Sequence, residues 1–312
     1  MTPHGRHLAR EDVAREAHPA VVLAAALLVG CVAVGIVGLV SLHHLRALDA
    51  PFRPAAASAA PWLPGEPAPG HEDDPAWRAA AVSPLLSMRP AAVRCAAPDL
   101  DVRRADAHAL EQRLQAIAAC FDAAWEPAVT GAGLAFEPVT VRVFEPSDGT
   151  GSTCGETEAV VPALYCPQDR TIYVSGAAAG HAHGDTSQAE ASLTGTLAHE
   201  YGHHVQSLTG VLDAADGLPD APRHGGDGDR VEPLRRVETM ATCLGALTHT
   251  RLASPLGPTQ AFYERMTDPG SYRADASHGR AGTQTRWAAR GYAADGDASA
   301  CAAFSAPAAA VA

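Results

Sequence analysis

The clearest pattern of apolar and polar positions lies between residues 188 and 209. Apolar side chains recur there at steps of four and three residues, the spacing that gathers them on one face of an α-helix. These residues are Leu193, Leu197, Tyr201, Val205 and Leu208. Ser187 and Glu190 fit a capping box at a helix start, and Gly210 fits the residue that ends a helix. The pattern predicts an amphipathic helix over residues 188–209.

The other face of this helix contains the motif His199-Glu200-x-x-His203. A spacing of four residues places His199 and His203 one helical turn apart, where both rings can bind one zinc ion. Glu200 lies about 100° around the helix from His199. It therefore borders the metal without binding it, as a general base for zinc-bound water would. A chance match in a chain with 15 histidines is the alternative, and the helix signals around the motif argue against it.

The same periodicities predict the elements around this helix. We expect further helices over 105–125, 234–244, 259–266 and 284–292, and strands over 139–144 and 170–174 joined by 152–166. The acidic stretch 212–230 is expected to be a solvated loop, with a cleft rim that favours basic substrates as the alternative. These elements predict a mainly helical α+β domain with a small sheet at 91–304, followed by a disordered tail at 305–312.

Residues 20–42 form an apolar run of 23 residues. At about 1.5 Å per residue, a helix of that length crosses the roughly 30 Å hydrocarbon core of a bilayer. A buried core helix would show a polar face, and a cleaved signal peptide would have an apolar region of about 7–15 residues. We therefore expect one transmembrane helix that contacts the lipid bilayer and anchors the protein in the cell membrane.

The segments on either side of this run differ in composition. Residues 43–90 are rich in Pro and Ala, which predicts an extended, poorly ordered linker between the bilayer and the domain. Arg is slightly more frequent before the apolar run than after it, which favours a cytoplasmic location for residues 1–19 under the positive-inside rule. The domain would then be extracytoplasmic in a single-pass protein.

Cysteine usage supports the same location. Cys31 lies in the apolar run, and six more cysteines lie in the domain. An even number without the close C-x₂₋₄-C spacing of zinc sites favours disulfides and an oxidising compartment. Of the pairings that six cysteines allow, we select Cys95–Cys120, Cys154–Cys166 and Cys243–Cys301. The formal net charge of −12, without basic clusters, argues against nucleic acid as a partner.

A catalytic zinc site needs three protein ligands and one open position. Gln206 and Thr209 occupy the positions where a metzincin would continue with Gly and His. The remaining option is a glutamate on a following helix. We select Glu238, because Glu232 precedes Pro233 and is expected to lie outside that helix.

Five segments of the chain share their motifs and their order with one family. They are Tyr165–Tyr173, His199–Gln206, Glu238–Cys243, Ser277–Gln284 leading into Arg286-Trp287 and Gly291-Tyr292, and Cys301–Phe304. From about Cys95 to Phe304 the chain thus resembles the bacterial putative neutral zinc metallopeptidases, which have one membrane span before an extracytoplasmic domain. The resemblance implies a gluzincin-like, and hence zincin-like, metallopeptidase domain. It implies zinc ligation by His199, His203 and Glu238, with Glu200 as the base.

Two further positions follow from the resemblance. Where the family is similar to Glu-Leu-Gln-Ala-Asp-Cys, this chain has Glu238-Thr-Met-Ala-Thr-Cys243, so Thr242 replaces an Asp. That Asp would lie one helical turn after the ligand and could orient a zinc-bound histidine. Thr242 would do so more weakly and lower the activity. His278 is a candidate donor to the developing oxyanion, with a structural role as the alternative.

These features predict a membrane-anchored, extracytoplasmic metalloprotease that uses Zn2+. It would hydrolyse peptide bonds of peptide or protein substrates with zinc-bound water activated by Glu200. Two alternatives stay open. One is a non-catalytic zinc-binding scaffold that lost turnover through Thr242, and the other is a zinc hydrolase that acts on non-peptide bonds of the envelope.

Overall fold

The computed structural model describes residues 62–145, 152–155, 162–177, 186–218, 231–253, 256, 259–272 and 274–312. Contacts divide the chain into Met1–Ala50 and Pro51–Ala312, and all the described residues belong to the second unit. The predicted N-terminal segment 1–19 and transmembrane helix 20–42 lie outside the described residues. Within them, every helix is too short or too polar to cross a bilayer.

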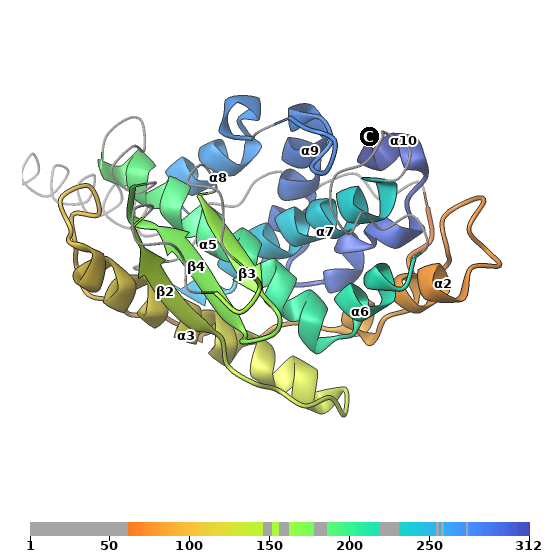
Figure 1. The fold of residues 1–312 in the computed structure, drawn as a ribbon, viewed down its shortest axis with the longest axis horizontal. Coiled ribbons are helices and arrows are strands. Elements are labelled where there is room, and N and C mark those ends of the chain that lie inside the picture. The colour runs from red at the N-terminus through yellow and green to blue at the C-terminus, as the bar shows by residue number, and fades with distance from the viewer. Residues whose placement is uncertain are drawn as a thin grey trace, which may run out of the picture. The chain divides into compact units, whose positions relative to one another are not determined.

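The described residues form a mainly helical α+β fold with two small sheets (Figure 1). The helices are α2 (Pro75–Ala81), α3 (Ala107–Gly131), α5 (Thr186–Leu208), α6 (Val211–Asp216), α7 (Glu232–His249), α8 (Gln260–Thr267), α9 (Ala281–Tyr292) and α10 (Ala308–Val311). Short 3-10 segments are η1 (Pro84–Ser87), η3 (Pro269–Ser271), η4 (Ala298–Cys301) and η5 (Ala303–Ser305). The strands are β1 (Val93–Arg94), β2 (Thr140–Phe144), β3 (Ala163–Cys166), β4 (Thr171–Ser175) and β5 (Leu252–Ala253).

The larger sheet has the strand order β2-β4-β3. β2 runs parallel to β4, with Val141 opposite Ile172, and β3 runs antiparallel to β4, with Tyr165 opposite Ile172. β4 is buried along its whole length because it lies in the middle of the sheet. Helices α3 and α5 contact this sheet, as Figure 1 shows. β3 lies within the predicted connection 152–166, where a strand of four residues is too short for its alternation to be recognised.

Helix α5 is the predicted central helix, and its apolar stripe lies in the main core. Leu197, Tyr201 and Val205 are fully buried. The helix ends where Gly210 adopts a left-handed conformation with φ of 74°, which glycine reaches without strain. The predicted helices over 105–125, 234–244, 259–266 and 284–292 correspond to α3, α7, α8 and α9.

Two glycines bring α5 and α7 into close contact. A Cβ atom added to Gly202 would lie 2.6 Å from the carbonyl oxygen of Ala241, and one added to Gly245 would lie 2.6 Å from that of Ala198. Any larger residue at either position would push the helices apart. The small residues therefore set the separation of the two helices that carry the predicted zinc ligands.

The structure corrects the predicted linker and tail. From residue 62 to 90 the chain is folded onto the domain instead of forming a disordered linker, and Trp77, Leu85 and Met88 are buried in the core. The indole nitrogen of Trp77 donates to the carbonyl oxygen of Phe304 at 2.9 Å. The predicted disordered tail contains α10, and Val311 is fully buried. Pro- and Ala-rich composition misled the prediction because alanines can fill a core as well as a solvated linker.

Three disulfides join the described cysteines. They are Cys95–Cys120, Cys154–Cys166 and Cys243–Cys301, the pairs selected from the sequence. The last one connects α7 to η4 across 58 residues of sequence. It therefore ties the helix that carries Glu238 to the C-terminal part of the domain.

Candidate metal centre

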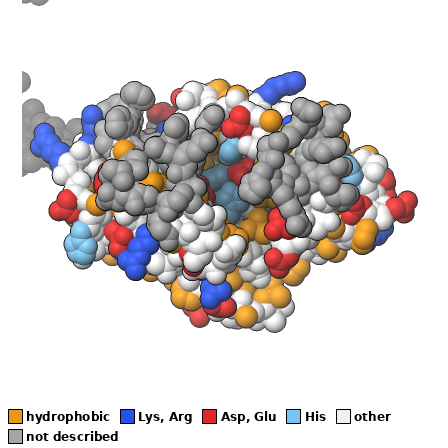
Figure 2. All heavy atoms as spheres, in the orientation of Figure 1, with side chains coloured by type: hydrophobic (Ala, Val, Ile, Leu, Met, Phe, Trp, Pro, Cys, Tyr) orange, Lys and Arg blue, Asp and Glu red, His pale blue; other side chains and the backbone are white. Residues whose placement is uncertain are grey.

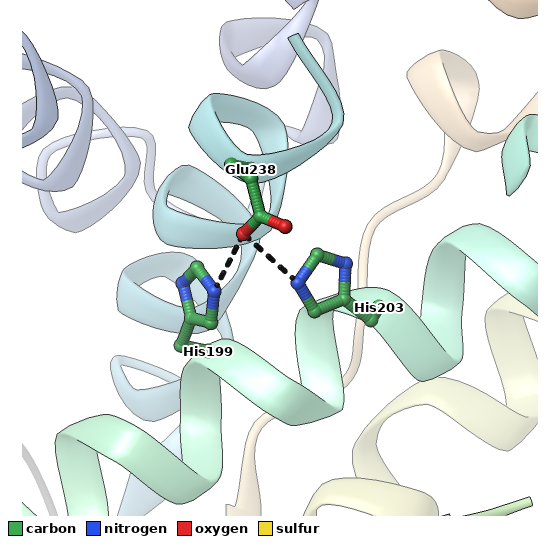
Figure 3. Close-up of side chains that lie close together, drawn as sticks. All are labelled: His199, His203 and Glu238. Atoms are coloured by element: carbon green, nitrogen blue, oxygen red, sulfur yellow. Dashed lines mark hydrogen bonds and ion pairs between the residues drawn. The ribbon is translucent and has the colours of Figure 1, made fainter. Parts of the chain in front are cut away.

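The predicted ligands meet between α5 and α7. His199 and His203 project from α5 and Glu238 projects from α7 toward both rings (Figure 3). The Nε2 atoms of His199 and His203 lie 3.1 and 3.2 Å from the same carboxylate oxygen, Oε2 of Glu238. All three side chains are largely buried, with 12 to 18% of each exposed. They form a group in which the ligand atoms lie within 4.8 Å of one another.

This spacing fits a tetrahedral zinc site. Ligand atoms at about 2.0–2.1 Å from zinc in tetrahedral directions are about 3.3 Å apart. The two nitrogen–oxygen distances at the centre are 3.1 and 3.2 Å. Two imidazoles and one carboxylate are also a donor set found at catalytic zinc sites. The three side chains therefore fit the ion in both geometry and chemistry.

Gln206 fixes the tautomer of His203. Its Nε2 donates to the carbonyl oxygen of Val237 at 2.8 Å, so its Oε1 is the atom that lies 2.9 Å from Nδ1 of His203. An amide oxygen can only accept, so Nδ1 of His203 carries the hydrogen. In the neutral ring the lone pair of Nε2 then points at the carboxylate of Glu238. Two acceptors at this distance repel each other unless a cation, a proton or a metal ion, lies between them.

The protein without metal supplies that cation as a proton. Burial lowers the pKa of His203, but the Glu238 carboxylate outweighs burial and raises the pKa to about 9. Burial alone would raise the pKa of Glu238, and the positive charge on His203 instead holds it well below its usual value. A cation is thus favoured at this point, and zinc binding would displace the shared proton.

Thr242 lies where the sequence placed it. Its Oγ1 is 3.2 Å from Nδ1 of His199, and the residue is only 1% exposed. The hydroxyl can accept the Nδ1–H of His199, which leaves Nε2 free to bind a metal. Gln206 and Thr242 thus hold the outer nitrogens of the two histidines, and both do so with neutral groups.

Glu200, the candidate base, follows His199 on α5. Its side chain lines the same cavity as the three ligands and is 8% exposed. Within the described part of the chain, its carboxylate forms no hydrogen bond and no ion pair. The carboxylate is therefore available to accept a proton in the cavity.

His278 approaches the centre from the loop before α9. Its Nε2 lies 3.4 Å from Oε2 of Glu238, and its Nδ1 lies 3.0 Å from Oδ1 of Asp275. The same Asp275 oxygen accepts the backbone N–H of His278 and the hydroxyl of Ser277, each at 2.8 Å. Asp275 therefore orients the ring so that Nε2 faces the cavity.

The cavity has a volume of about 520 Å³ and is open to solvent. Figure 2 shows histidine side chains at the bottom of a hollow in the middle of one face. Residues 162–165, at the start of β3, form one wall, and residues of α8 and the segment after it form another. The floor is the polar face of α5 with His199, Glu200 and His203.

The structure brings together the candidate site residues selected from the sequence. His199, Glu200, His203, Glu238, Thr242 and His278 all lie together at the cavity or at its ligands. Glu232 is in the first turn of α7 rather than outside the helix, and it pairs with Arg236 at 2.6 Å, away from the centre. Gln206 and Asp275 were missed as orienting residues. Asp275 had a local signal, because Asp-x-Ser-His places a carboxylate within reach of the following ring.

Comparison with known proteins agrees with this geometry. The model of the family described as "Putative neutral zinc metallopeptidase" matches residues 83–252. Uncharacterised proteins of Mycobacterium bovis and of two strains of Mycobacterium tuberculosis are 33% identical over 164 residues, which cover 47% of this chain and 50% of each relative. The chain thus matches about half the length of these relatives. No solved structure matches it. Because the family model covers more than half of the chain, the protein belongs to the putative neutral zinc metallopeptidase family.

Proposed function

We propose that this protein is a zinc-dependent endopeptidase or exopeptidase whose centre is His199, His203 and Glu238 with Glu200 as base. The observation that carries the proposal is the group of three ligand atoms within 4.8 Å of one another, in the same cavity as the Glu200 carboxylate, which has no partner among the described residues. Zinc bound by these side chains supplies a Lewis acid that polarises a carbonyl group and lowers the pKa of water.

The protein side chains then have separate roles. Glu200 accepts the proton of the attacking water and passes it to the nitrogen of the leaving amine. His278, whose Nδ1–H is held by Asp275, donates from Nε2 to the oxygen that gains negative charge during attack when its ring carries a proton on both nitrogens. Gln206 and Thr242 keep the two histidine ligands in one tautomer and one orientation.

The wall of the cavity favours a peptide as substrate. β3 is one of the two edge strands of the larger sheet within the described residues, and its residues Ala163, Leu164 and Tyr165 line the cavity. An edge strand offers backbone N–H and C=O groups that an extended peptide can pair with. A non-peptide envelope substrate would gain nothing from this edge. For this reason we favour peptide hydrolysis over the other hydrolase reaction.

The test is hydrolysis by the full chain, because residues 62–90 belong to the folded domain and must be kept. Purified protein in detergent is incubated with casein and with quenched-fluorescent peptides, with zinc and with a chelator. We expect cleavage that the chelator stops and that zinc restores. Glu200→Gln should lower kcat by about 100- to 10,000-fold, the usual contribution of a general base, at an unchanged zinc content. Cleavage that survives Glu200→Gln would contradict the mechanism, and absence of cleavage with bound zinc would favour the scaffold alternative.

We also propose that residues 20–42 anchor the domain on the extracytoplasmic side of the cell membrane. The apolar run and the three disulfides support this location. Protease added to intact cells should digest the domain and spare an N-terminal tag. Digestion that requires permeabilised cells would show the opposite orientation.

A further inference from the structure

Arg265 is a cation in the wall of the cavity that the chemistry described so far does not use. It lies in the last turn of α8 and is partly buried. It is the single Lys or Arg among the described residues that line the cavity. Within the described part of the chain, no carboxylate forms an ion pair with Arg265 and no acceptor forms a hydrogen bond with it.

The three carboxylates that line the cavity have other roles. Glu238 contacts His199, His203 and His278, and Asp275 holds His278. Glu200 is the base at the metal centre. Two exposed acidic residues lie close to Arg265 in the sequence. Glu264 of α8 accepts from Nε2 of Gln260 at 2.6 Å, and Asp268, just after α8, accepts the backbone N–H of Gly270 at 3.1 Å. Burial outweighs the attraction of Tyr272 and Asp268 and lowers the pKa of the guanidinium, so these two groups offset its desolvation only in part.

The position of Arg265 is fixed by its neighbours. Phe262 and Met266 on α8 are buried, and a Cβ atom added to Gly195 of α5 would lie 2.9 Å from Sδ of Met266. The hydroxyl of Tyr272 donates to the carbonyl oxygen of Met266 at 2.8 Å. These contacts hold the end of α8 against the helix that carries the zinc ligands. Arg265 therefore lies on a helix end that packing holds in place.

A purely structural role explains why a positive charge lies at the end of α8, but not why the guanidinium is partly buried. A positive charge in the last turn of a helix is favoured by the helix dipole, by about 0.3–1 kcal/mol at an exposed site. An Arg pointing to solvent would gain the same stabilisation without losing water. Burial instead lowers the pKa of the Arg265 guanidinium, which shows that its charged form is partly desolvated. A bound anion would offset that loss.

We propose that Arg265 binds a carboxylate of the substrate and makes this protein select acidic peptides. This inference rests on the proposed function, because it concerns the same cavity. A guanidinium binds a carboxylate through two parallel N–H···O bonds, and this geometry suits Arg better than Lys. The carboxylate has two possible sources with the same chemistry, the C-terminus of the peptide or a Glu or Asp side chain.

Four peptides of one sequence separate these sources. They carry either a free C-terminal carboxylate or an amide, combined with either Glu or Gln at one internal position. Binding of each labelled peptide to zinc-loaded, full-length Glu200→Gln protein is measured by fluorescence anisotropy, and cleavage is measured with the wild-type active centre. We expect at least one carboxylate to strengthen binding by about 10- to 100-fold, as a charge-assisted hydrogen bond does. The peptide that shows the gain identifies the source.

Variants at position 265 test whether Arg265 causes the preference. Arg265→Gln should remove the gain for the acidic peptide and leave binding of the neutral peptide unchanged. Arg265→Lys should keep part of the gain, because it keeps the charge without the planar guanidinium. Arg94→Gln is the matched control, since Arg94 is exposed on β1 and does not line the cavity. Thermal unfolding of each variant checks that it is folded.

The outcomes separate this inference from the proposed function. Equal binding of neutral and acidic peptides, or an acidic preference that Arg265→Gln leaves intact, would overturn the role of Arg265 even if the protein hydrolyses peptides. An acidic preference lost in Arg265→Gln would support it even if wild-type protein cleaves none of the four peptides. In that second case only the proposed hydrolytic function would be contradicted.

Discussion

His203 and His204 are neighbours in the sequence and face opposite surroundings in the structure. His203 lies on the cavity side of α5, with its Nε2 beside the carboxylate of Glu238. His204 is fully buried on the side of the sheet. Its Nε2 donates to the carbonyl oxygen of Glu137 at 3.0 Å, and its Nδ1 accepts from the hydroxyl of Tyr165 at 3.1 Å.

The two rings consequently differ in charge. Burial lowers the pKa of His204 to about 4, because the hydrogen bond to the Glu137 carbonyl offsets only part of the desolvation and the charge of Arg170 lowers the pKa further. In His203 the carboxylate of Glu238 outweighs burial and raises the pKa to about 9. One residue of helical rotation therefore separates a histidine that attracts a cation from one that excludes it. The comparison shows that the charge of a histidine in this motif depends on the groups packed against its ring, and not on the imidazole alone.

The strongest test of this comparison is the zinc content of two single variants. His203→Ala should lower zinc from near one ion per chain to near zero, because it removes one of three ligands. His204→Gln should keep the zinc, since its amide can replace both hydrogen bonds of the buried ring and neither goes to the metal centre. Metal analysis of purified full-length protein by mass spectrometry gives the result. Equal zinc in the two variants would contradict the assignment of His203.

Acid stability separates core histidines from cavity histidines. His249 on α7 is stacked on Phe262, with its Nδ1 unpaired within the described residues, and burial lowers its pKa to about 3. The unfolded chain binds a proton near pH 6.5 and the folded chain does not, so the free energy of unfolding falls as pH drops below about 6.5. The loss from His249 reaches about 3 kcal/mol near pH 4.5.

His249→Leu should remove this part of the acid loss, because leucine does not titrate. Urea unfolding of wild type and variant at pH 7 and at pH 4.5 measures the difference. His108→Gln is the control, since His108 is exposed on α3 and its replacement should leave the acid loss as it is in wild type. An identical acid loss in wild type and His249→Leu would show that His249 is not held neutral in the core.

A variant at Gln206 tests the His203 half of this comparison, on the cavity side of α5. Gln206→Leu removes the acceptor for Nδ1–H of His203, so the ring loses its fixed tautomer. We expect zinc affinity to fall by up to about 100-fold, the upper range for loss of such a partner. Competition with a chelator of known affinity measures it. Thr209→Val is a matched control, because among the described residues the Thr209 hydroxyl bonds only backbone carbonyls of α5. A loss as large in this variant would indicate a general loosening of the helix.

The smallest expected effect is a gain at Thr242. Thr242→Asp replaces a neutral acceptor at His199 by a charged one, which makes the ring a better donor to zinc. Zinc affinity and turnover should rise by about 10-fold, the lower range for such partners. Thr239→Val is the control, because the Thr239 hydroxyl on the same helix has no hydrogen-bond partner among the described residues. If Thr242→Asp changes neither quantity, the 3.2 Å contact does not orient His199.

The sequence by itself determined the local parts of this protein. The apolar stripe and the ending glycine specify α5, and the spacing of four residues puts His199 and His203 on one face, whatever the rest of the chain does. Period and composition also predicted α3, α7, α8 and α9, since long amphipathic helices carry a strong signal. The short strand β3 and the folded segment 62–90 carry only a weak signal in the sequence, and the predictions from the sequence missed both.

Only the tertiary structure decided how these parts meet. Contacts at Gly202 and Gly245 set the distance between α5 and α7, and that distance brings Glu238 to the two histidines. Gln206 orients His203 only because the carbonyl of Val237, on another helix, turns its amide. The environment of Arg265 likewise depends on α8 lying against α5. Such contacts join residues distant in sequence, so no local periodicity encodes them, and packing and desolvation determine their chemistry.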